Sequence, residues 1–404
     1  MSSTKKAQNK SGQSWTLEEE ALLYELKWNG LTYAIISSQL GRSIYSCEKK
    51  YRNTDWTKKP FYDTAKRRLR DNYKQALVDK VSSAKDQKLH ASVLQSEILA
   101  DRLESVVVSL PRVNKTVYKR SENKNKTKHL PEDVGLIISD AHIGHHHTLE
   151  ETGGLSEYNL DIFKSRVEFL KSTTADIVEL HSKLYDLPNL HIFCPGDMVA
   201  GMNSTGAWSA TYINMCILDQ AVEGAEALAD MIYYWLGLFD NIYFYGVYGN
   251  HGRAAPRGIE KEYVNWDYIT YKFLEAKFSQ NPRVKFVIPK AWWSMQTIRN
   301  HKFLLIHGED VRGSTAIRGL STYTDHMIGI IKDIPEYVIA GHFHSAAELS
   351  TNYGRLILNG SFIGGEIYSL KDLQKSSKPE QKIFGIHDRR GLTWMYNIDL
   401  SHAQ

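Results

Sequence analysis

Five short polar clusters in the second half of the chain combine the residue types that bind divalent metal ions. In chain order they are Asp140-Ala141-His142, Gly196-Asp197, Gly249-Asn250-His251, His307-Gly308 and Gly341-His342-Phe343-His344. Carboxylate and amide oxygens mixed with imidazole nitrogens suit Mn²⁺, iron or Zn²⁺ better than Ca²⁺ or a thiolate-bound ion. Without His251 the clusters hold seven ligands, which is enough for two ions if one carboxylate bridges them. Two ions about 3.5–4 Å apart can clamp an in-line displacement at phosphorus.

Each cluster lies at or near the end of a segment whose apolar run predicts a β-strand. We expect strands at residues 136–139, 191–194, 242–248, 284–288, 303–306, 337–340 and 355–359, and helices near 161–184, 214–237, 266–278 and 321–331. This alternation predicts an α/β layered architecture. In open α/β sheets the ligand lies in the crevice outside the strand ends, which is where these clusters would be.

The order of the clusters resembles the signature of the calcineurin-like metallophosphoesterases, over about residues 132–397. The resemblance implies a layered sandwich of mixed β-sheets flanked by helices. It implies that one ion is held by Asp140, His142, Asp197 and His344, and the other by Asp197, Asn250, His307 and His342. The expected cofactors are therefore two divalent ions, Mn²⁺ ahead of iron or Zn²⁺.

Two further residues have implied roles at the substrate. His251 is expected to hydrogen-bond the phosphate or to protonate the leaving oxygen, a role that suits an imidazole near neutral pH. Arg253 is expected to clamp the phosphate. The pattern Asp-x-His-x-Gly from Asp140 to Gly144 also resembles that of the SbcD-type repair nucleases.

The chain departs from the family pattern after the second and third clusters. Ala200 stands where an acid often follows Asp197, and Gly252 follows His251 where Asp or Glu is common. Those acids help to orient the site, so we expect the corresponding support to come from elsewhere in the chain.

Two other segments have more than one interpretation. The three histidines at residues 145–147 are interpreted as a polar loop at the rim of the site, although one of them could contact the substrate. Trp292 and Trp293 are interpreted as core or rim packing, with base stacking as the alternative.

Basic residues are concentrated in the first third of the 404-residue chain. Residues 1–130 hold 26 Lys and Arg against 14 Asp and Glu, while residues 131–404 hold 24 against 32. This asymmetry indicates either a front end that binds a polyanion or a solvated lysine-rich arm. Three scattered cysteines favour a reducing compartment. No segment resembles a secretory signal or a membrane span, so we expect a cytoplasmic protein, in the host cytoplasm if a phage encodes it.

Residues 14–56 predict three short helices, the last two joined by Gly41-Arg42-Ser43. In the second helix the residues expected to face inward are Ala34, Ile35, Ile36 and Leu40. The unit resembles a Myb/SANT-type DNA-binding domain at Trp15, the acidic run 18–20, Leu26, Ile35, Leu40, the glycine turn and Cys47. By analogy, the residues that face the groove or the phosphates are Tyr45, Ser46, Lys49, Lys50 and Arg52. The alternative is that the third helix presents only the solvated face of a small bundle.

The segments around this unit have simpler predictions. Residues 1–13 are expected to be disordered, 57–110 to form a helical arm that could dimerise, and 111–131 to form a basic linker. A domain at 132–404 then carries all five clusters. No GxxxxGK[ST] motif occurs, so we expect no ATP site.

Together these features predict a two-metal phosphodiesterase that cleaves DNA, with the front end binding that partner. One alternative is a phosphomonoesterase or small-nucleotide phosphodiesterase whose front end serves only for localisation. Another is a DNA-binding protein with a degenerate metal site, against which the full set of seven ligands argues.

Overall fold

The computed structural model describes residues 14–28, 32–59, 130–202, 212–312, 315–365, 367, 370 and 377–403. They belong to two compact units, one within residues 1–104 and one within residues 105–404. The predicted disordered segment at residues 1–13 lies outside the described residues, as do nearly all of the predicted helical arm and basic linker, between residues 60 and 129.

The described residues of the first unit form a bundle of three helices, as the sequence predicts. Its elements are α1 (Leu17–Trp28), α2 (Tyr33–Leu40), α3 (Ile44–Asn53) and the 3₁₀ helix η1 (Trp56–Lys58). A capping box begins α1, because the Thr16 hydroxyl accepts from the Glu19 backbone N–H and the Glu19 carboxylate accepts from the Thr16 N–H, both at 3.2 Å. Gly41 ends α2 with φ 66°, a left-handed conformation that costs glycine little.

The core of this unit is small. Leu23, Ile36, Leu40 and Cys47 are buried together, with partly buried aromatic side chains around them. The prediction that Ile35 faces inward is wrong, because its side chain is 46% exposed. The short helix α2 packs against its neighbours on one side only, and Ile36 lies on that side.

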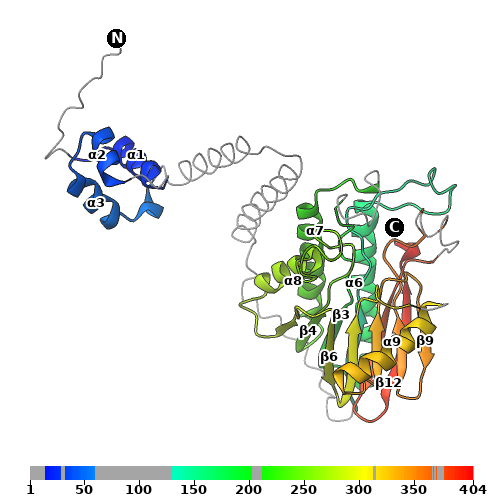
Figure 1. Ribbon diagram of the computed structural model, residues 1–404. Helices are drawn as coiled ribbons and strands as arrows, with labels where there is room; N and C mark the ends of the chain where they lie inside the picture. The colour runs from blue at the N-terminus through cyan, green and yellow to red at the C-terminus, as the bar shows by residue number, and fades with distance from the viewer. Residues whose placement is uncertain are drawn as a thin grey trace. The chain divides into compact units, whose positions relative to one another are not determined.

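The second unit contains two mixed β-sheets (Figure 1). The seven-stranded sheet has the order β12 (Gly391–Asp399), β11 (Glu380–His387), β1 (Leu130–Ile137), β3 (Asn189–Cys194), β4 (Asn241–Gly246), β5 (Val284–Val287), with β2 (Tyr185–Asp186) beside β1. The five-stranded sheet has the order β6 (Trp293–Ile298), β7 (His301–Ile306), β8 (Tyr337–Ala340), β10 (Arg355–Leu358), β9 (Ala347–Ser350). β1, β3, β4 and β5 are parallel, whereas β11 is antiparallel to both of its neighbours.

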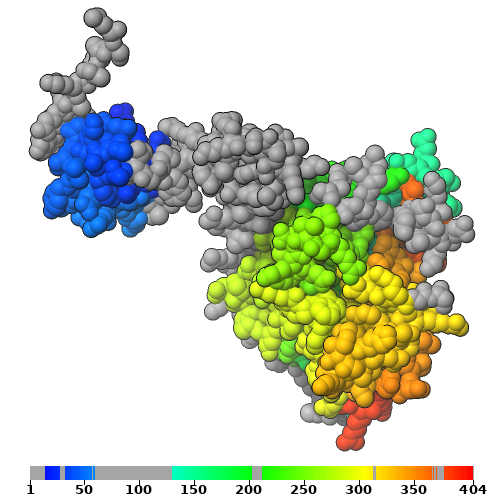
Figure 2. Space-filling view, viewed as in Figure 1, coloured from blue at the N-terminus to red at the C-terminus, as the bar shows by residue number. Residues whose placement is uncertain are grey.

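Alternate side chains of the strands enter different hydrophobic cores. On one face of the larger sheet lie α6 (Leu160–Ser182), α7 (Ile217–Trp235) and α8 (Trp266–Lys277), which form a core with residues such as Leu136 and Ile192. The next residues, Ile137 and Phe193, point to the other face and pack between the two sheets. The outer face of the smaller sheet is covered by α9 (Ala316–Ile331), which lies at the surface in Figure 2.

This arrangement is a helix–sheet–sheet–helix sandwich, and it confirms the predicted α/β fold class with a small trihelical unit before it. All seven predicted strands and all four predicted helices of this unit are present, with ends that differ by a few residues. β2, β6, β9, β11 and β12 were not predicted, and β1 begins at Leu130, inside the end of the predicted linker. Within the described residues, no helix is both long and apolar enough to span a membrane.

Candidate metal centre

The five polar clusters meet at one edge of the sandwich, where β1, β3, β4, β7 and β8 end. Their side chains form three overlapping groups, and within each group the ligand atoms lie within 4.8 Å of one another. The groups are Asp140 with His142 and His344, His142 with Asp197 and His251, and Asp197 with His307 and His342. Asp197 belongs to two groups, which is the position that a bridging carboxylate requires.

The spacing of the ligand atoms fits shared coordination of metal ions. The Nε2 atoms of His142 and His344 are 2.9 Å apart, and His307 Nε2 lies 3.0 Å from Asn250 Oδ1 and 3.1 Å from Asp197 Oδ2. Two ligand atoms about 2.1 Å from one ion and at right angles to each other would be about 3 Å apart. The donor set of carboxylate, amide and imidazole therefore fits divalent ions, and its residues are buried or partly buried.

The backbone is strained at most of these ligands. Among the described non-glycine residues, positive φ angles occur at five of the seven predicted ligands, namely Asp140 (53°), His142 (44°), Asp197 (52°), His342 (70°) and His344 (53°). Such angles cost of order 1–3 kcal/mol each and persist where the surrounding structure enforces them, often at functional sites.

Glycines next to the ligands permit close approach of the backbone. A Cβ atom on Gly249 would lie 2.1 Å from the Asp197 Oδ1 atom, and one on Gly341 would lie 2.5 Å from the Asp140 Oδ2 atom. Any side chain at either position would displace a carboxylate of the centre. The glycines that flank the clusters in the sequence therefore have a steric role at the site.

Backbone carbonyls orient two of the imidazole rings. His307 Nδ1 lies 2.7 Å from the Pro195 carbonyl oxygen, and His251 Nδ1 lies 3.2 Å from that of Ala200. When Nδ1 donates to the carbonyl, Nε2 is left as the atom that faces the centre. His251 lies among the ligands, with its ring centroid 4.5 Å from that of His142.

The two carboxylates have opposite pKa shifts. Burial raises the pKa of Asp140 to about 7, and the negative charge of Asp197 adds to this effect. Burial would also raise the pKa of Asp197, but the neighbouring His307 and His251 outweigh it and hold that pKa well below its usual value. Burial alone would lower the pKa of His307, yet the two carboxylates raise it to about 10. The centre thus concentrates negative charge that a divalent ion would neutralise.

Sequence reasoning missed Asp267, a buried carboxylate in the first turn of α8. It accepts from backbone N–H groups in two of the loops that carry predicted ligands: Asp197 (2.9 Å), Met198 (2.9 Å), Val199 (3.3 Å) and Gly249 (2.8 Å). Asp267 therefore supports the loops of Asp197 and Gly249 from elsewhere in the chain. An acid at the start of a predicted helix was visible in the sequence, but acids are common there.

Neutral groups, rather than a second carboxylate, position Asp140. Its carboxylate accepts from the Ser139 hydroxyl at 2.5 Å and from the His342 backbone N–H at 2.9 Å. Gln381 of β11 accepts from the Ser139 N–H at 2.9 Å and from the Asn359 side-chain amide at 2.8 Å. Asn359 also donates to the Ser139 hydroxyl oxygen at 3.0 Å, so the network fixes the direction of the hydroxyl that reaches Asp140.

Arg253, the predicted phosphate clamp, lies at the rim and pairs with Glu309, two residues after His307. A second pair joins Arg257 to Asp310 at 2.6 Å. These ion pairs connect the loop that follows β4 with the loop that follows β7. The guanidinium of Arg253 is therefore held by a carboxylate of the loop that follows His307.

His145 and His147 are buried rather than at an open rim, which differs from the interpretation of residues 145–147 as a polar loop. His145 Nε2 lies 3.1 Å from His147 Nδ1, and His147 Nε2 lies 3.2 Å from the Ser156 hydroxyl. Burial lowers the pKa of His145 to about 2 and that of His147 to about 4. Of the three histidines, His146 is the one left partly exposed.

In the trihelical unit, the predicted DNA-facing residues of α3 differ in their surroundings. Tyr45 is 71% exposed and Lys49 is also exposed. Lys50 pairs instead with the buried Glu20 at 2.6 Å, and Arg52 pairs with Glu48 at 2.8 Å. Ser46 is partly buried, and its backbone N–H donates to the Ser43 cap at 3.1 Å.

No protein-family model and no curated protein sequence matches the chain. Among solved structures it is similar to vacuolar protein sorting 29 from Cryptosporidium parvum, with 14% identity and a TM-score of 0.34 over 68% of this chain and 94% of that one. It is also similar to an archaeal phosphodiesterase, with 13% identity and a TM-score of 0.29 over 66% of this chain and 99% of that one. A predicted phosphoesterase from Streptococcus pneumoniae is similar as well, with 10% identity and a TM-score of 0.26 over 67% of this chain and 99% of that one. Because these sequence identities and TM-scores are low, the functional assignment rests on the geometry of the site.

Proposed function

We propose that the chain is a two-metal phosphodiesterase of the calcineurin-like metallophosphoesterase type that cleaves DNA. The observation that carries the proposal is the set of three overlapping ligand groups, two of which share Asp197. One ion would be held by Asp140, His142, Asp197 and His344, and the other by Asp197, Asn250, His307 and His342. Mn²⁺ is the first choice of metal, with iron and Zn²⁺ as the others that this donor set accepts.

When bound, two such ions supply Lewis-acid polarisation of a phosphoryl oxygen and a water molecule of lowered pKa. The chain's own residues then act on the substrate. His251, oriented by the Ala200 carbonyl, hydrogen-bonds the phosphate or protonates the leaving oxygen. Arg253 exchanges its partner Glu309 for the phosphate, since a guanidinium binds either anion with paired hydrogen bonds.

DNA is the proposed substrate because the front of the chain is basic and contains a three-helix unit whose sequence resembles a DNA-binding domain. Exposed Tyr45 and Lys49 on α3 are available for contacts with DNA. Lys50 and Arg52 would have to leave Glu20 and Glu48 to make such contacts. We therefore assign Lys49 the larger part in binding phosphate.

The nuclease activity is tested with purified full-length chain, labelled single- and double-stranded DNA, and a panel of Mn²⁺, Fe²⁺ and Zn²⁺. Metal-dependent cleavage is expected in the wild type and lost in Asp197→Asn and His251→Ala. His402→Ala, at an exposed position near the end of the chain, is the matched control and should cleave normally. Equal cleavage by all variants would indicate a contaminating nuclease. Turnover of phosphomonoesters or cyclic nucleotides without DNA cleavage would assign the site to a different ester.

The role of the front end has its own test. Lys49→Ala should weaken DNA binding and reduce the slope of log K against log salt by about 1, as expected for the loss of one phosphate contact. Removing residues 1–60 should reduce affinity and slope further. An unchanged salt slope in both proteins would exclude the trihelical unit from DNA binding, whether or not the metal centre cleaves DNA.

A further inference from the structure

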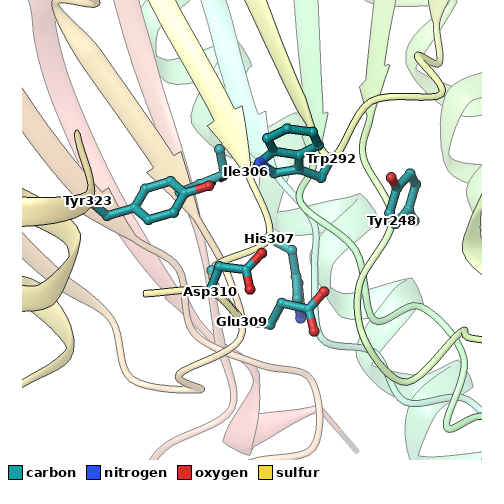
Figure 3. A pocket seen from close by; sticks show the side chains of 8 residues that line it. Tyr248, Trp292, Ile306, His307, Glu309, Asp310 and Tyr323 are labelled. Carbon is teal, nitrogen blue, oxygen red and sulfur yellow. Dashed lines mark hydrogen bonds between the residues drawn. The ribbon is translucent and has the colours of Figure 1, made fainter. Parts of the chain in front are cut away.

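A small pocket lies beside His307, on the side of the loop that follows β7 (Figure 3). Three aromatic side chains from three separate elements line it: Tyr248 after β4, Trp292 before β6 and Tyr323 in α9. Glu309 and Asp310 line it as well. The space inside it is small, so a planar ligand would lie against its exposed lining rather than fill it.

Of the three aromatic side chains, Trp292 is exposed, Tyr323 is partly buried and Tyr248 is buried, and hydrogen bonds hold them in place. Trp292 is 40% exposed, although an indole gains considerably from burial. Its Nε1–H donates to the Tyr323 hydroxyl at 3.0 Å, and the Tyr248 hydroxyl donates to the Lys290 carbonyl at 3.3 Å. A planar ligand would therefore meet ring faces that are already oriented and lose little further side-chain entropy on binding.

The carboxylates determine which planar ligand fits. Glu309 pairs with Arg253 and Asp310 pairs with Arg257, so the two pairs are together close to neutral. Each carboxylate has two oxygens and about four lone-pair sites, so it can accept further hydrogen bonds from N–H groups. A phosphate would be repelled from these oxygens, whereas the ring and amino N–H donors of a nucleobase would be accepted.

We propose that this pocket binds the nucleobase attached to the phosphate at the metal centre, with Trp292 as its stacking surface. The pocket is continuous with that centre because His307 belongs to both. The inference rests on the proposed function, since it places a nucleic-acid phosphate at the ions. It assigns to Trp292 the base-stacking role that was the alternative interpretation of the sequence, while Trp293 is the first residue of β6.

The test compares two ligands that share a sugar phosphate and differ by one base. Full-length protein in Mn²⁺ is titrated calorimetrically with adenosine 5′-monophosphate and with ribose 5-phosphate. Stacking on an aromatic side chain contributes about 1–3 kcal/mol per base, so the nucleotide should bind about tenfold more tightly or better. Trp292→Ala should reduce nucleotide affinity to that of ribose 5-phosphate, and Trp292→Phe should retain most of it. Ribose 5-phosphate should bind equally to all three proteins.

Tyr353→Ala is the matched control, because Tyr353 is a 45% exposed aromatic residue in the turn between β9 and β10. It should bind both ligands as the wild type does. Equal affinity of the wild type for the two ligands would overturn the proposal. An equal loss of both ligands in Trp292→Ala would also overturn it, because that residue would then only maintain the structure. Failure of the wild type to bind either ligand would overturn this inference together with the phosphate site.

The binding result is independent of turnover, so the two proposals can fail separately. A base preference that depends on Trp292, in a protein that cleaves no DNA with any metal, would retain the nucleobase pocket and reject the nuclease. DNA cleavage without any base preference in binding would retain the nuclease and reject the pocket.

Discussion

The two carboxylates at the heart of the metal centre, Asp140 and Asp197, follow parallel neighbouring strands and are held in different ways. Asp140 accepts hydrogen bonds from a hydroxyl and a backbone N–H, and the groups behind them are amides. Asp197 accepts from the His251 backbone N–H at 2.8 Å, while a second buried carboxylate, Asp267, holds its main chain. One ligand is thus positioned through its side chain and the other mainly through its loop.

This difference has an electrostatic consequence. Asp267 adds a third buried carboxylate near the centre, and burial together with the Asp197 charge raises the pKa of Asp267 to about 6. The neutral network around Gln381 adds no charge to Asp140. The Asp197 side should therefore depend more strongly on bound cations than the Asp140 side does.

The largest expected effect is the loss of metal and activity at Asp197, the proposed bridging carboxylate, compared with Asp140, which would bind one ion. Asp197→Asn should remove both ions and reduce phosphodiester cleavage on the order of 1000-fold, because each ion contributes several kcal/mol of charge stabilisation. Asp140→Asn should retain one ion per chain. Native mass spectrometry of the metal-loaded proteins gives the stoichiometry, with the exposed Asp325→Asn as control. Two ions in Asp197→Asn would show that Asp197 does not bridge.

The next largest effect is expected at Asp267, the carboxylate that holds the loops of Asp197 and Gly249. Asp267→Asn should weaken metal binding about 10- to 100-fold, the usual range for partners that orient ligands. An amide offers one acceptor oxygen where four backbone N–H groups require two. Asp161→Asn is the matched control, since Asp161 lies in the first turn of α6 and away from the centre. A metal-binding isotherm equal to that of the wild type would assign Asp267 to folding alone.

A smaller effect is expected at Gln381, whose amide belongs to the neutral network behind Asp140. Gln381→Leu leaves the Ser139 N–H without its acceptor and should weaken metal binding by about tenfold or less, at the low end of the range for orienting partners. Gln296→Leu, in β6 and outside the centre, is the control. If Gln381→Leu has a larger effect than Asp267→Asn, the proposed ranking of the two supports is reversed.

The smallest effect at neutral pH involves the loop that follows Asp140. The pKa of His147 is lowered to about 4, so its neutral form stabilises the fold above the unfolded pKa of about 6.5, and this stability is lost as pH falls toward 4. In the metal-free protein, His147→Gln should reduce the slope of the unfolding free energy with pH by about 1.4 kcal/mol per pH unit in that window. Denaturant unfolding between pH 4 and 7 measures this slope. His402→Gln should leave it unchanged, and an unaltered slope in His147→Gln would mean that the pKa of His147 is the same in the folded and unfolded chain.

Much of the fold and the ligand set could be predicted because both have local signals. Apolar runs such as those of β3 and β4 are buried on both faces, and each ligand follows directly after such a run. β11 was missed because Glu380, Gln381 and Lys382 begin it with polar side chains, although these are buried or partly buried in the structure. Their burial depends on long-range partners such as Ser139, which the local sequence does not reveal.

The supports of the site could not be predicted for the same reason. Asp267 is 70 residues from Asp197, and Gln381 is 242 residues from Ser139. No spacing rule connects residues so far apart, so only the packed fold brings them together. The sequence did indicate that support was missing after Asp197 and His251, but it did not indicate where the replacement lies.

The position of Asp267 at the start of α8 also has a consequence for local unfolding. The remainder of that helix packs into the core through residues such as Tyr271 and Leu274. Fraying of the first turn would release the loops of Asp197 and Gly249 at the same moment, since both depend on one carboxylate. Hydrogen exchange of the amides in those loops and in the first turn of α8 should therefore slow together when metal is added, as one cooperative opening unit.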